Sequence, residues 1–362
     1  MAASFHTVHV NDTYNQDPGR DASAGYSPNH QNSGRTIMLE DKTKNVRQQL
    51  TGPDGGTLLG FLCVLGAVTV LTRQGREVNT RWVFHEGRWL AEIQGNIPTE
   101  PEKLSALVFA SLEKQLSAHP LFFTCLPDHA RAAEIARWHT RTEWLHPVCL
   151  EGAGALLDTT TQLTPWYQLV RRDYWQGVLQ KTFERTEEQH ITQALYGPWN
   201  FPDPFEGVKL RLTPLENRRH ARQWYPPSND PARYVWGAML GGNRLALETH
   251  PWWEAISSGQ QEDELSQVGH SRGKEGWCWT WPLWSDWVTV PTLRTLLTLT
   301  TLLAPFPTPE LRQEWHALGL NAVFRVRRFI VGKTLNFTSP ECLMAVPIPT
   351  APHGKPSQAA GN

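Results

Sequence analysis

Positive charge is concentrated near the carboxyl end of the chain, in the stretch VFRVRRFIVGKTLNFT at residues 323–338. Its cations are Arg325, Arg327, Arg328 and Lys333, and no acidic residue accompanies them. Burying an unpaired guanidinium costs several kcal/mol, so these side chains must meet carboxylates from elsewhere in the fold or face water and an anion. With the amide of Asn336 beside them, they predict a contact for a phosphate backbone. The alternative is an edge strand that its charge keeps soluble.

The same stretch has the pattern of a β-strand whose apolar residues need to be covered. With a period of two, Arg325 and Arg327 lie on one face of such a strand and Arg328 lies on the other. We therefore expect the three guanidinium groups to point in two directions.

A second basic segment covers residues 209–233, KLRLTPLENRRHARQWYPPSNDPAR. Its six Lys and Arg residues outnumber two acidic ones, which gives a net charge of +4. Arg218, Arg219 and Arg222 precede Trp224. Cations beside an aromatic ring are typical of surfaces that stack the bases of a single strand and neutralise its phosphates. The segment predicts a nucleic-acid contact, with a solvated loop as the alternative.

A third candidate is MLGGNRLALE at residues 239–248, where Gly241 and Gly242 precede Asn243 and a helical run. Asn243 is predicted to be the N-cap of a helix whose exposed backbone N–H groups can accept a phosphate. The spacing matches neither a Walker A loop nor GxGxxG, so a plain helix cap is the alternative.

The sequence offers little catalytic chemistry. GHSRG at 269–273 matches the G-x-S-x-G nucleophile elbow, but that motif needs a strand before Ser271 and a helix after it. The flanking stretches QEDELSQV and KEGW fit neither, so we predict a mobile loop. His139, His146 and Cys149 match no zinc template. We expect no catalytic residue, no metal and no cofactor, and therefore not an enzyme.

The elements that position these residues predict an α+β fold with mixed helices and short antiparallel sheets. Helices are expected at 57–71, from Pro101, at 128–141, from Pro165 to Arg185, in a short segment ending at Gly197, at 291–303 and at 308–318. A hairpin is expected at 81–93, with its turn at His85-Glu86-Gly87.

The chain is predicted to have four parts. Residues 1–47 and 347–362 are expected to be disordered tails, because they are polar or rich in Pro and Gly and lack periodicity. Between them, 48–197 is a mainly helical subdomain with a hairpin, and 198–346 is an α+β subdomain rich in Trp and Arg. The prolines of GPWNFPDPF separate the two, since this stretch cannot hold a regular element.

Tryptophan is unusually frequent, with 17 residues, and WCWTWPLWSDW at 277–287 is the densest stretch. Trp277, Trp279 and Trp281 alternate and would line one face of an extended segment. Core packing is the favoured interpretation, and base stacking or a protein contact is the alternative.

Composition restricts the partners and the compartment. The formal net charge is −1, so local patches rather than the overall field must attract any anionic partner. The five cysteines show no C-x-x-C spacing, which suits reduced thiols, and the first residues lack the pattern of a signal or transit peptide. The apolar run at 57–71 is shorter than the ~20 residues that cross a bilayer. We predict a cytoplasmic protein with no membrane partner.

Three stretches together resemble segments of CRISPR-associated subunits. LTGPDGGTLLGFLCVLGAVTVL is similar to an opening in which a glycine turn precedes L-G-F-L-x-x-L-G. MLGGNRLALE is similar to a GANRLA segment, and WPLW followed by VFRVRRFIVGKTLNFT is similar to an ending of the form VFRSRRITVGKFRNFT. The family with this resemblance is the accessory protein of type I-G (formerly I-U) CRISPR systems, described as an extension of the helicase-nuclease subunit.

The resemblance implies a role in RNA-guided antiviral defence, within or beside the surveillance complex that carries guide RNA. The matching positions are Gly241, Asn243, Arg244, Arg325, Arg327, Arg328, Lys333 and Asn336. Val326 departs from the family pattern, where a small polar residue is expected, and Thr334-Leu335 replaces a more basic pair.

The expected protein is a non-catalytic subunit that grips guide RNA or single-stranded target DNA through arginines and nearby aromatics. Its other partners would be CRISPR-associated proteins. The alternative is a structural adaptor that binds other protein subunits of the complex without touching nucleic acid, since Arg and Trp are also enriched in protein interfaces.

Overall fold

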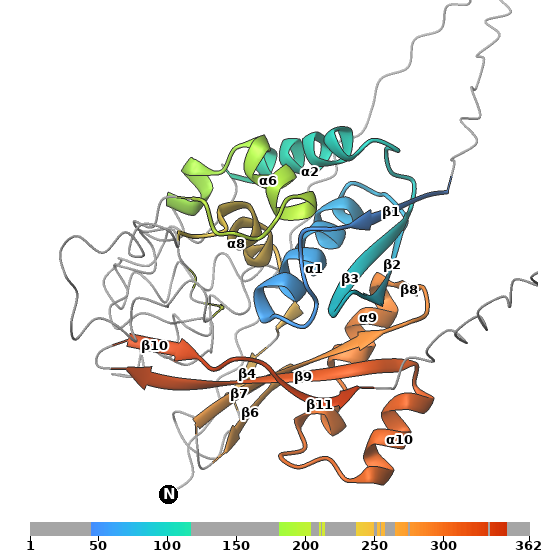
Figure 1. Ribbon diagram of the computed structural model, residues 1–362, viewed down its shortest axis with the longest axis vertical. Coiled ribbons are helices and arrows are strands. Elements are labelled where there is room, and N and C mark those ends of the chain that lie inside the picture. The colour runs from blue at the N-terminus through green and yellow to red at the C-terminus, as the bar shows by residue number, and fades with distance from the viewer. Residues whose placement is uncertain are drawn as a thin grey trace, which may run out of the picture. The chain divides into compact units, whose positions relative to one another are not determined.

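The structure is a computed structural model that describes residues 45–116, 181–203, 210, 212–213, 237–249, 252–253, 255–257, 265–273, 276–331 and 334–345 (Figure 1). Residues from Thr43 onward form one compact unit. The tail predicted at 347–362, the helix at 128–141 and most of the helix from Pro165 lie outside the described residues. The tail predicted at 1–47 extends too far along the chain, because Val46 and Arg47 already belong to a sheet, where they pair with Gly95 and Gln94.

The first sheet is antiparallel and has the strand order β1-β3-β2-β8. Its strands are β1 (Val46–Leu50), β2 (Val78–His85), β3 (Arg88–Gly95) and β8 (Val288–Thr289). The predicted hairpin is confirmed, and its turn consists of Glu86 and Gly87 with φ angles of 48° and 80°. Positive φ at both central residues is the conformation that a tight two-residue hairpin turn requires.

The second sheet has the order β10-β9-β7-β6, and β11 pairs with β9 off this path. Its strands are β6 (His270–Gly273), β7 (Gly276–Trp284), β9 (Leu320–Val331), β10 (Thr334–Phe337) and β11 (Glu341–Ala345). A separate pair consists of β4 (Ala255–Ser257) and β5 (Leu265–Gln267). The basic stretch at 323–338 is therefore a hairpin, since the chain turns back after Val331.

The helices are α1 (Leu58–Arg73), α2 (Pro101–Leu116), α6 (Glu188–Tyr196), α8 (Leu240–Leu247), α9 (Val290–Leu297), the 3-10 helix η5 (Thr300–Leu303) and α10 (Pro309–Ala317). The predicted α+β fold is confirmed. The helix predicted at 291–303 is two elements, because α9 ends at its C-cap Thr298 and a 3-10 turn follows.

Threonine is the N-cap residue of three of these helices. Thr57, Thr289 and Thr308 each accept a hydrogen bond from the backbone N–H three residues further on, which satisfies one of the free donors of the first turn. A proline follows the cap within two residues in α9 and α10, where its missing N–H costs nothing.

None of the helices in the described part of the chain is both long enough and apolar enough to span a bilayer.

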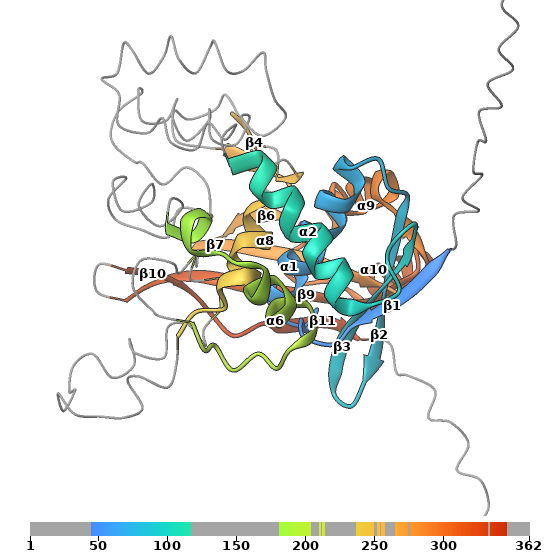
Figure 2. The ribbon, with the colours of Figure 1, turned by 90° about the horizontal axis from the view of Figure 1, so that it is seen from above.

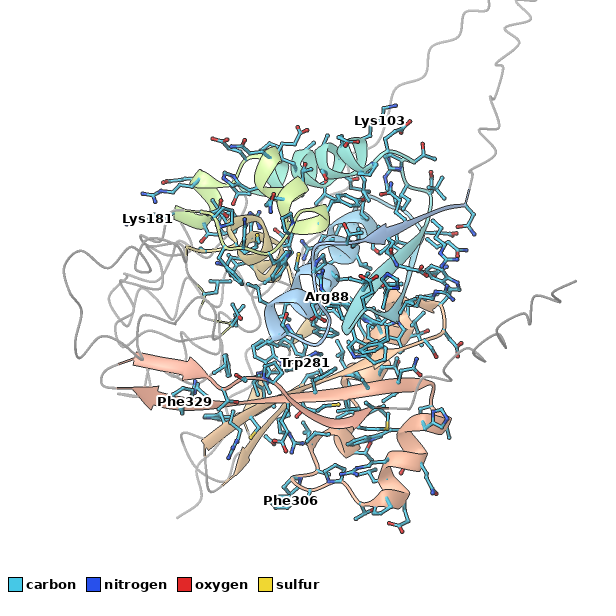
Figure 3. The ribbon with its side chains drawn as sticks, viewed as in Figure 1. Arg88, Lys103, Lys181, Trp281, Phe306 and Phe329 are labelled. Carbon is cyan, nitrogen blue, oxygen red and sulfur yellow. The ribbon has the colours of Figure 1, made fainter. Side chains whose placement is uncertain are left out.

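Helix α1 is the centre of the core, and every residue from Leu58 to Leu71 is buried. Phe61 packs against Trp82 of β2 and against Trp281 and Trp284 of β7, with ring centroids 6.1–6.3 Å apart. Both sheets therefore contribute to one core around α1, and Figure 3 shows Trp281 beneath this helix. The two subdomains predicted at 48–197 and 198–346 share this core.

Three of the four tryptophans of β7 are core residues, in agreement with the interpretation favoured from the sequence, whereas Trp277 is half-buried. Trp279, Trp281 and Trp284 are buried. The indole N–H groups of Trp281 and Trp284 donate to the carbonyl oxygens of Gly55 and Thr80, each at 2.8 Å. Their polar atoms are thus satisfied inside the fold, as buried indoles require.

Helix α8 packs closely on α1 and α6, and glycines make this possible. A Cβ at Gly66 of α1 would lie 1.9 Å from the carbonyl oxygen of Leu245, and one at Gly241 would lie 2.0 Å from that of His190. The prediction that Asn243 caps this helix is wrong, because the helix begins at Leu240 with Met239 as its N-cap. Gly241 lies inside the helix because the backbone of α6 leaves no room for a side chain there.

Candidate nucleic-acid interface

The strands of the second sheet are strongly basic. β6, β7, β9 and β10 together contain the four arginines Arg272, Arg325, Arg327 and Arg328 and no Asp or Glu. In the sequence, Lys274 and Glu275 follow β6, and their charges cancel. In β11, Glu341 lies opposite Arg325. An excess of cationic over acidic residues on these strands favours a local positive potential, whatever the net charge of the chain.

The period of two predicted for β9 is confirmed. Arg325 pairs with Thr280 and Arg327 with Cys278 across the β7–β9 ladder, and Arg328 pairs with Phe337 of β10. Arg325 and Arg327 therefore lie on the same face of the sheet, and Arg328 lies on the opposite one. Burial differs sharply along this face, since Arg325 is buried and Arg327 is exposed.

Arg325 is an internal residue and not part of an interface. Its Nη2 donates to the carbonyl oxygens of Leu302 (3.1 Å) and Ala304 (2.6 Å), and its Nη1 donates to that of Pro305 (2.9 Å). Its Nε donates to the Oγ1 of Thr280 at 2.9 Å. Burial lowers the pKa of this guanidinium. The sequence predicted that Arg325 contacts a phosphate. In the structure its guanidinium instead binds backbone carbonyls at the C-terminal end of η5, because a helix C-terminus attracts a cation.

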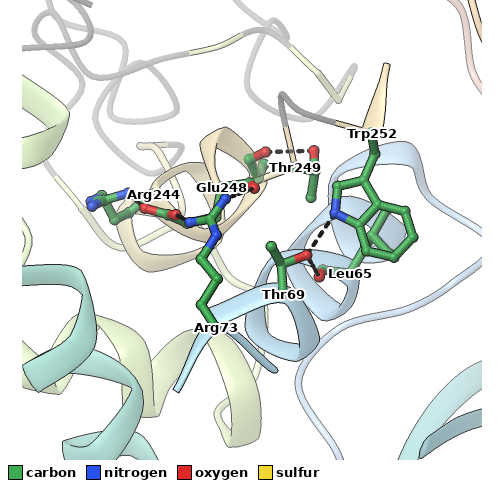
Figure 4. A network of polar contacts seen from close by, with 8 residues as sticks. Leu65, Thr69, Arg73, Arg244, Glu248, Thr249 and Trp252 are labelled. Carbon is green, nitrogen blue, oxygen red and sulfur yellow. Dashed lines mark hydrogen bonds and ion pairs between the residues drawn. The ribbon is translucent and has the colours of Figure 1, made fainter. Parts of the chain in front are cut away.

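Asn243 and Arg244 are also inside the fold, with 0% and 1% of their surface exposed. The Nη1 of Arg244 donates to the Oε1 of Glu248 at 2.5 Å, and its guanidinium carbon lies 3.9 Å from the centre of the Phe183 ring. Arg73 donates to the other oxygen of the same carboxylate, also at 2.5 Å (Figure 4). Burial lowers the pKa of Arg244, and the charge of Glu248 opposes this effect. An external phosphate has no access to either predicted residue.

The exposed end of β9 carries a cation and an aromatic ring on one face. Arg327 is exposed, and 42% of Phe329, two residues further on, is exposed as well (Figure 3). The backbone of Arg327 is tied to Thr338: its N–H donates to Thr338 Oγ1 at 3.0 Å, and its carbonyl accepts from Thr338 N–H at 2.8 Å. Arg328 is half-exposed on the other face. A positive charge and a ring are thus held side by side.

Comparison with known protein families, curated proteins and solved structures finds no match for this chain. Any functional proposal therefore depends on its own residues.

Several predicted contacts cannot be placed. Arg218, Arg219, Arg222, Trp224 and Lys333 lie outside the described residues. Asn336 is described only through its backbone, which pairs with Phe329 in the β9–β10 ladder. The predicted interface therefore reduces to Arg327 and Arg328 within the described part of the chain. Phe329 joins them, and the two-residue spacing from Arg327 is the signal that would have identified it.

Ser271 does not lie in a nucleophile elbow. GHSRG was predicted to be a mobile loop, which is wrong for its last four residues, because they form β6 and the next strand pairs with them in a hairpin. A strand follows Ser271 where the elbow needs a helix. The neighbouring His270 is buried, and burial together with the charge of Arg328 lowers its pKa to about 3. Its Nδ1 lies 2.7 Å from the carbonyl oxygen of Val268. Successive residues of a strand point to opposite faces, so this imidazole is not placed to activate the hydroxyl.

Among the described residues, no group of three or more His, Cys, Asp or Glu side chains is arranged to hold a metal ion.

Proposed function

We propose that this chain is a non-catalytic, cytoplasmic subunit of a CRISPR antiviral defence complex, and that the exposed end of β9 contacts guide RNA or single-stranded target DNA. Two things support the proposal: the resemblance of three sequence stretches to type I-G accessory proteins, and the chemistry of the second sheet. Other CRISPR-associated proteins would be its protein partners.

The observation that carries the proposal is that Arg327 and Phe329 are both exposed on one face of β9. A guanidinium neutralises and hydrogen-bonds a phosphate, and an exposed ring stacks on a base without regard to its identity. The two sit two residues apart on one face, so one nucleotide of a single strand can use both. Arg328 adds charge from the other face of the same strand.

Replacing Arg327 or Phe329 is expected to weaken single-strand binding. For Phe329→Leu we expect roughly tenfold lower affinity, because stacking of a base on an aromatic side chain contributes about 1–3 kcal/mol. For Arg327→Gln, the slope of log K against log salt is expected to become less steep by about 0.7, since one phosphate contact is lost. Titration of fluorescein-labelled oligo(U) and oligo(dT) at several salt concentrations measures both effects.

Arg312→Gln is the matched control, because Arg312 is an exposed arginine on α10, outside this sheet. It should leave both affinity and salt slope close to those of the unaltered protein. Unaltered binding by the Arg327 and Phe329 variants, with their folds intact, would contradict the proposed contact.

Phe306 favours a second candidate function, that of an adaptor between protein subunits. It is 89% exposed, the highest value among the exposed large hydrophobic residues of the described chain (Figure 3). Pro305 precedes it with its carbonyl held by Arg325, and Pro307 follows it with φ restricted by its ring. Restricting the backbone before binding reduces the entropy lost in the complex, so Phe306 is well suited to fill an apolar pocket of a partner.

The adaptor function predicts that Phe306→Ala weakens the capture of a protein subunit roughly thirtyfold, as expected for a residue at the centre of an interface. The measurement is a pull-down of co-expressed subunits after nuclease treatment, followed by titration of the purified subunit. Phe84→Ala serves as the control, since Phe84 is also exposed but lies on β2. Equal affinities for the two variants would argue against the adaptor function.

A further inference from the structure

One row of side chains crosses the outer face of the first sheet. Arg47 comes from β1, Glu92 from β3 and Arg81 from β2, while Trp287 immediately precedes β8. Arg81 lies directly opposite Glu92 in the β2–β3 ladder. The inner face of the same sheet is covered by α1, through the contact of Phe61 with Trp82.

The carboxylate of Glu92 holds the two guanidinium groups of this row in place. The Nη2 of Arg47 donates to both of its oxygens, at 2.5 and 2.6 Å, and the Nε of Arg81 donates to one of them at 2.7 Å. Burial alone would raise the pKa of Glu92, but the hydrogen bonds and charges of Arg47 and Arg81 lower it below its ordinary value. Glu92 is therefore ionised near neutral pH, and the row keeps a net charge of +1.

The Trp287 ring lies against both cations. The guanidinium carbon of Arg81 is 4.6 Å from the ring centre, and that of Arg47 is 5.7 Å away. Both distances are within the range of a cation–π contact, which orients the flat groups without consuming their N–H donors. The row is thus an ordered surface of planar groups rather than two flexible arginines.

Much of the donor capacity of this row faces outward. Within the described part of the chain, the hydrogen bonds of Arg47 use only Nη2 and those of Arg81 use only Nε. The side chain of Arg47 is 53% exposed and that of Arg81 is 26% exposed. The buried cluster of Arg244 and Glu248 differs in this respect, since it is enclosed on all sides. A guanidinium with accessible N–H donors is suited to bind a phosphate.

The rest of the face adds neutral hydrogen-bonding groups. Gln49 of β1 is exposed beside the row, and Asn79 of β2 and Gln94 of β3 are half-exposed and pair with each other across the ladder. Amide side chains donate and accept, so they can contact the edges of unpaired bases. Cations, a stacked ring and amides on the open face of an antiparallel sheet are the chemistry that single-strand-binding sheets use.

We propose that this outer face, centred on Arg47, Arg81 and Trp287, is a second contact surface for single-stranded nucleic acid. The inference rests on the proposed function and adds a site to it. Figures 1 and 2 both place the exposed end of β9 and the β1-β3-β2 strands at opposite sides of the described fold. A strand long enough to reach both surfaces would therefore bind more tightly than one that reaches a single surface.

The test compares variants of the two surfaces in the full-length protein, with fluorescein-labelled oligo(U) of increasing length. Trp287→Leu is expected to lower the affinity for long strands roughly tenfold, and Trp287→Phe should restore most of it because a ring is retained. Arg47→Gln should reduce the salt slope by about 0.7, as one phosphate contact is removed. Photo-crosslinking with 5-bromouridine oligonucleotides should label a peptide that contains Trp287.

The outcomes separate this inference from the proposed function. If Arg327→Gln weakens binding while Arg47→Gln and Trp287→Leu bind like the unaltered protein, the second surface is refuted and the first remains. If the unaltered protein binds neither oligo(U) nor oligo(dT), both fail. Thermal unfolding of each variant shows whether its fold is intact, and if Trp287→Leu does not fold, Arg47→Gln and the cross-link decide the result. Arg312→Gln is again the control for loss of an exposed charge.

Discussion

Replacement of Glu248 by Gln is expected to destabilise the protein by about 3–5 kcal/mol. The Glu248 carboxylate is fully buried and accepts hydrogen bonds from Arg244 and Arg73, which join α8 to α1 (Figure 4). An amide has the same shape but no charge, so it leaves the buried Arg244 without a counterion. Desolvating an uncompensated guanidinium is costly, and the cation–π contact with Phe183 offsets only a small part of that cost. Urea unfolding of both proteins, followed by tryptophan fluorescence, measures the difference.

A double variant distinguishes charge from packing at this position. Arg244→Met combined with Glu248→Leu removes both buried charges and keeps apolar volume, so it should be clearly more stable than Glu248→Gln alone. Replacement of buried ion pairs by well-packed apolar residues is often close to neutral, whereas removal of one partner is not. A Glu248→Gln protein that unfolds at the same urea concentration as the original would show that the carboxylate is not needed there.

Much of the fold could be predicted because its signals are local. The apolar run of α1, the Pro101 that opens α2 and the Glu86-Gly87 turn each depend on a few neighbouring residues. The start of α8 could not be predicted in this way. Gly241 and Asn243 resemble a helix cap, and only the approach of the α6 backbone explains why a glycine is needed at position 241 inside this helix.

For the candidate site, the sequence correctly predicted on which face of β9 each arginine lies, but not which of the arginines are buried. A period of two correctly placed Arg325 and Arg327 on one face of β9. The same period says nothing about where the chain between η5 and α10 covers that face, and this cover separates the internal Arg325 from the exposed Arg327.

The row of side chains on the first sheet could not be predicted from the sequence. Arg47, Arg81, Glu92 and Trp287 come from four segments, the last nearly two hundred residues beyond the others. Each is unremarkable among its own neighbours in sequence. Only the order β1-β3-β2-β8 brings them together, and long-range strand pairing of this kind is not encoded in any local pattern.

Arg325→Met separates a structural arginine from a nucleic-acid contact. It is expected to destabilise the fold by about 3 kcal/mol, because three carbonyl oxygens and a hydroxyl lose a charged donor within a largely buried site. Oligo(U) affinity of the folded fraction should nevertheless match that of the original protein, since Arg325 is 5% exposed and Arg327 remains in place. Urea unfolding and fluorescence titration at low temperature measure the two quantities separately.

The opposite pattern would identify Arg325 as a ligand of the phosphate backbone. In that case Arg325→Met would keep its stability and lose affinity and salt slope as Arg327→Gln does. This combination is energetically costly: to reach a phosphate, Arg325 would have to give up its hydrogen bonds to the carbonyls of Leu302, Ala304 and Pro305 and leave them without their donor. The same carbonyls hold the chain before Phe306, so loss of the arginine should also loosen that residue. A subunit that needs Phe306 would then bind Arg325→Met less tightly, while oligo(U) binding stays the same.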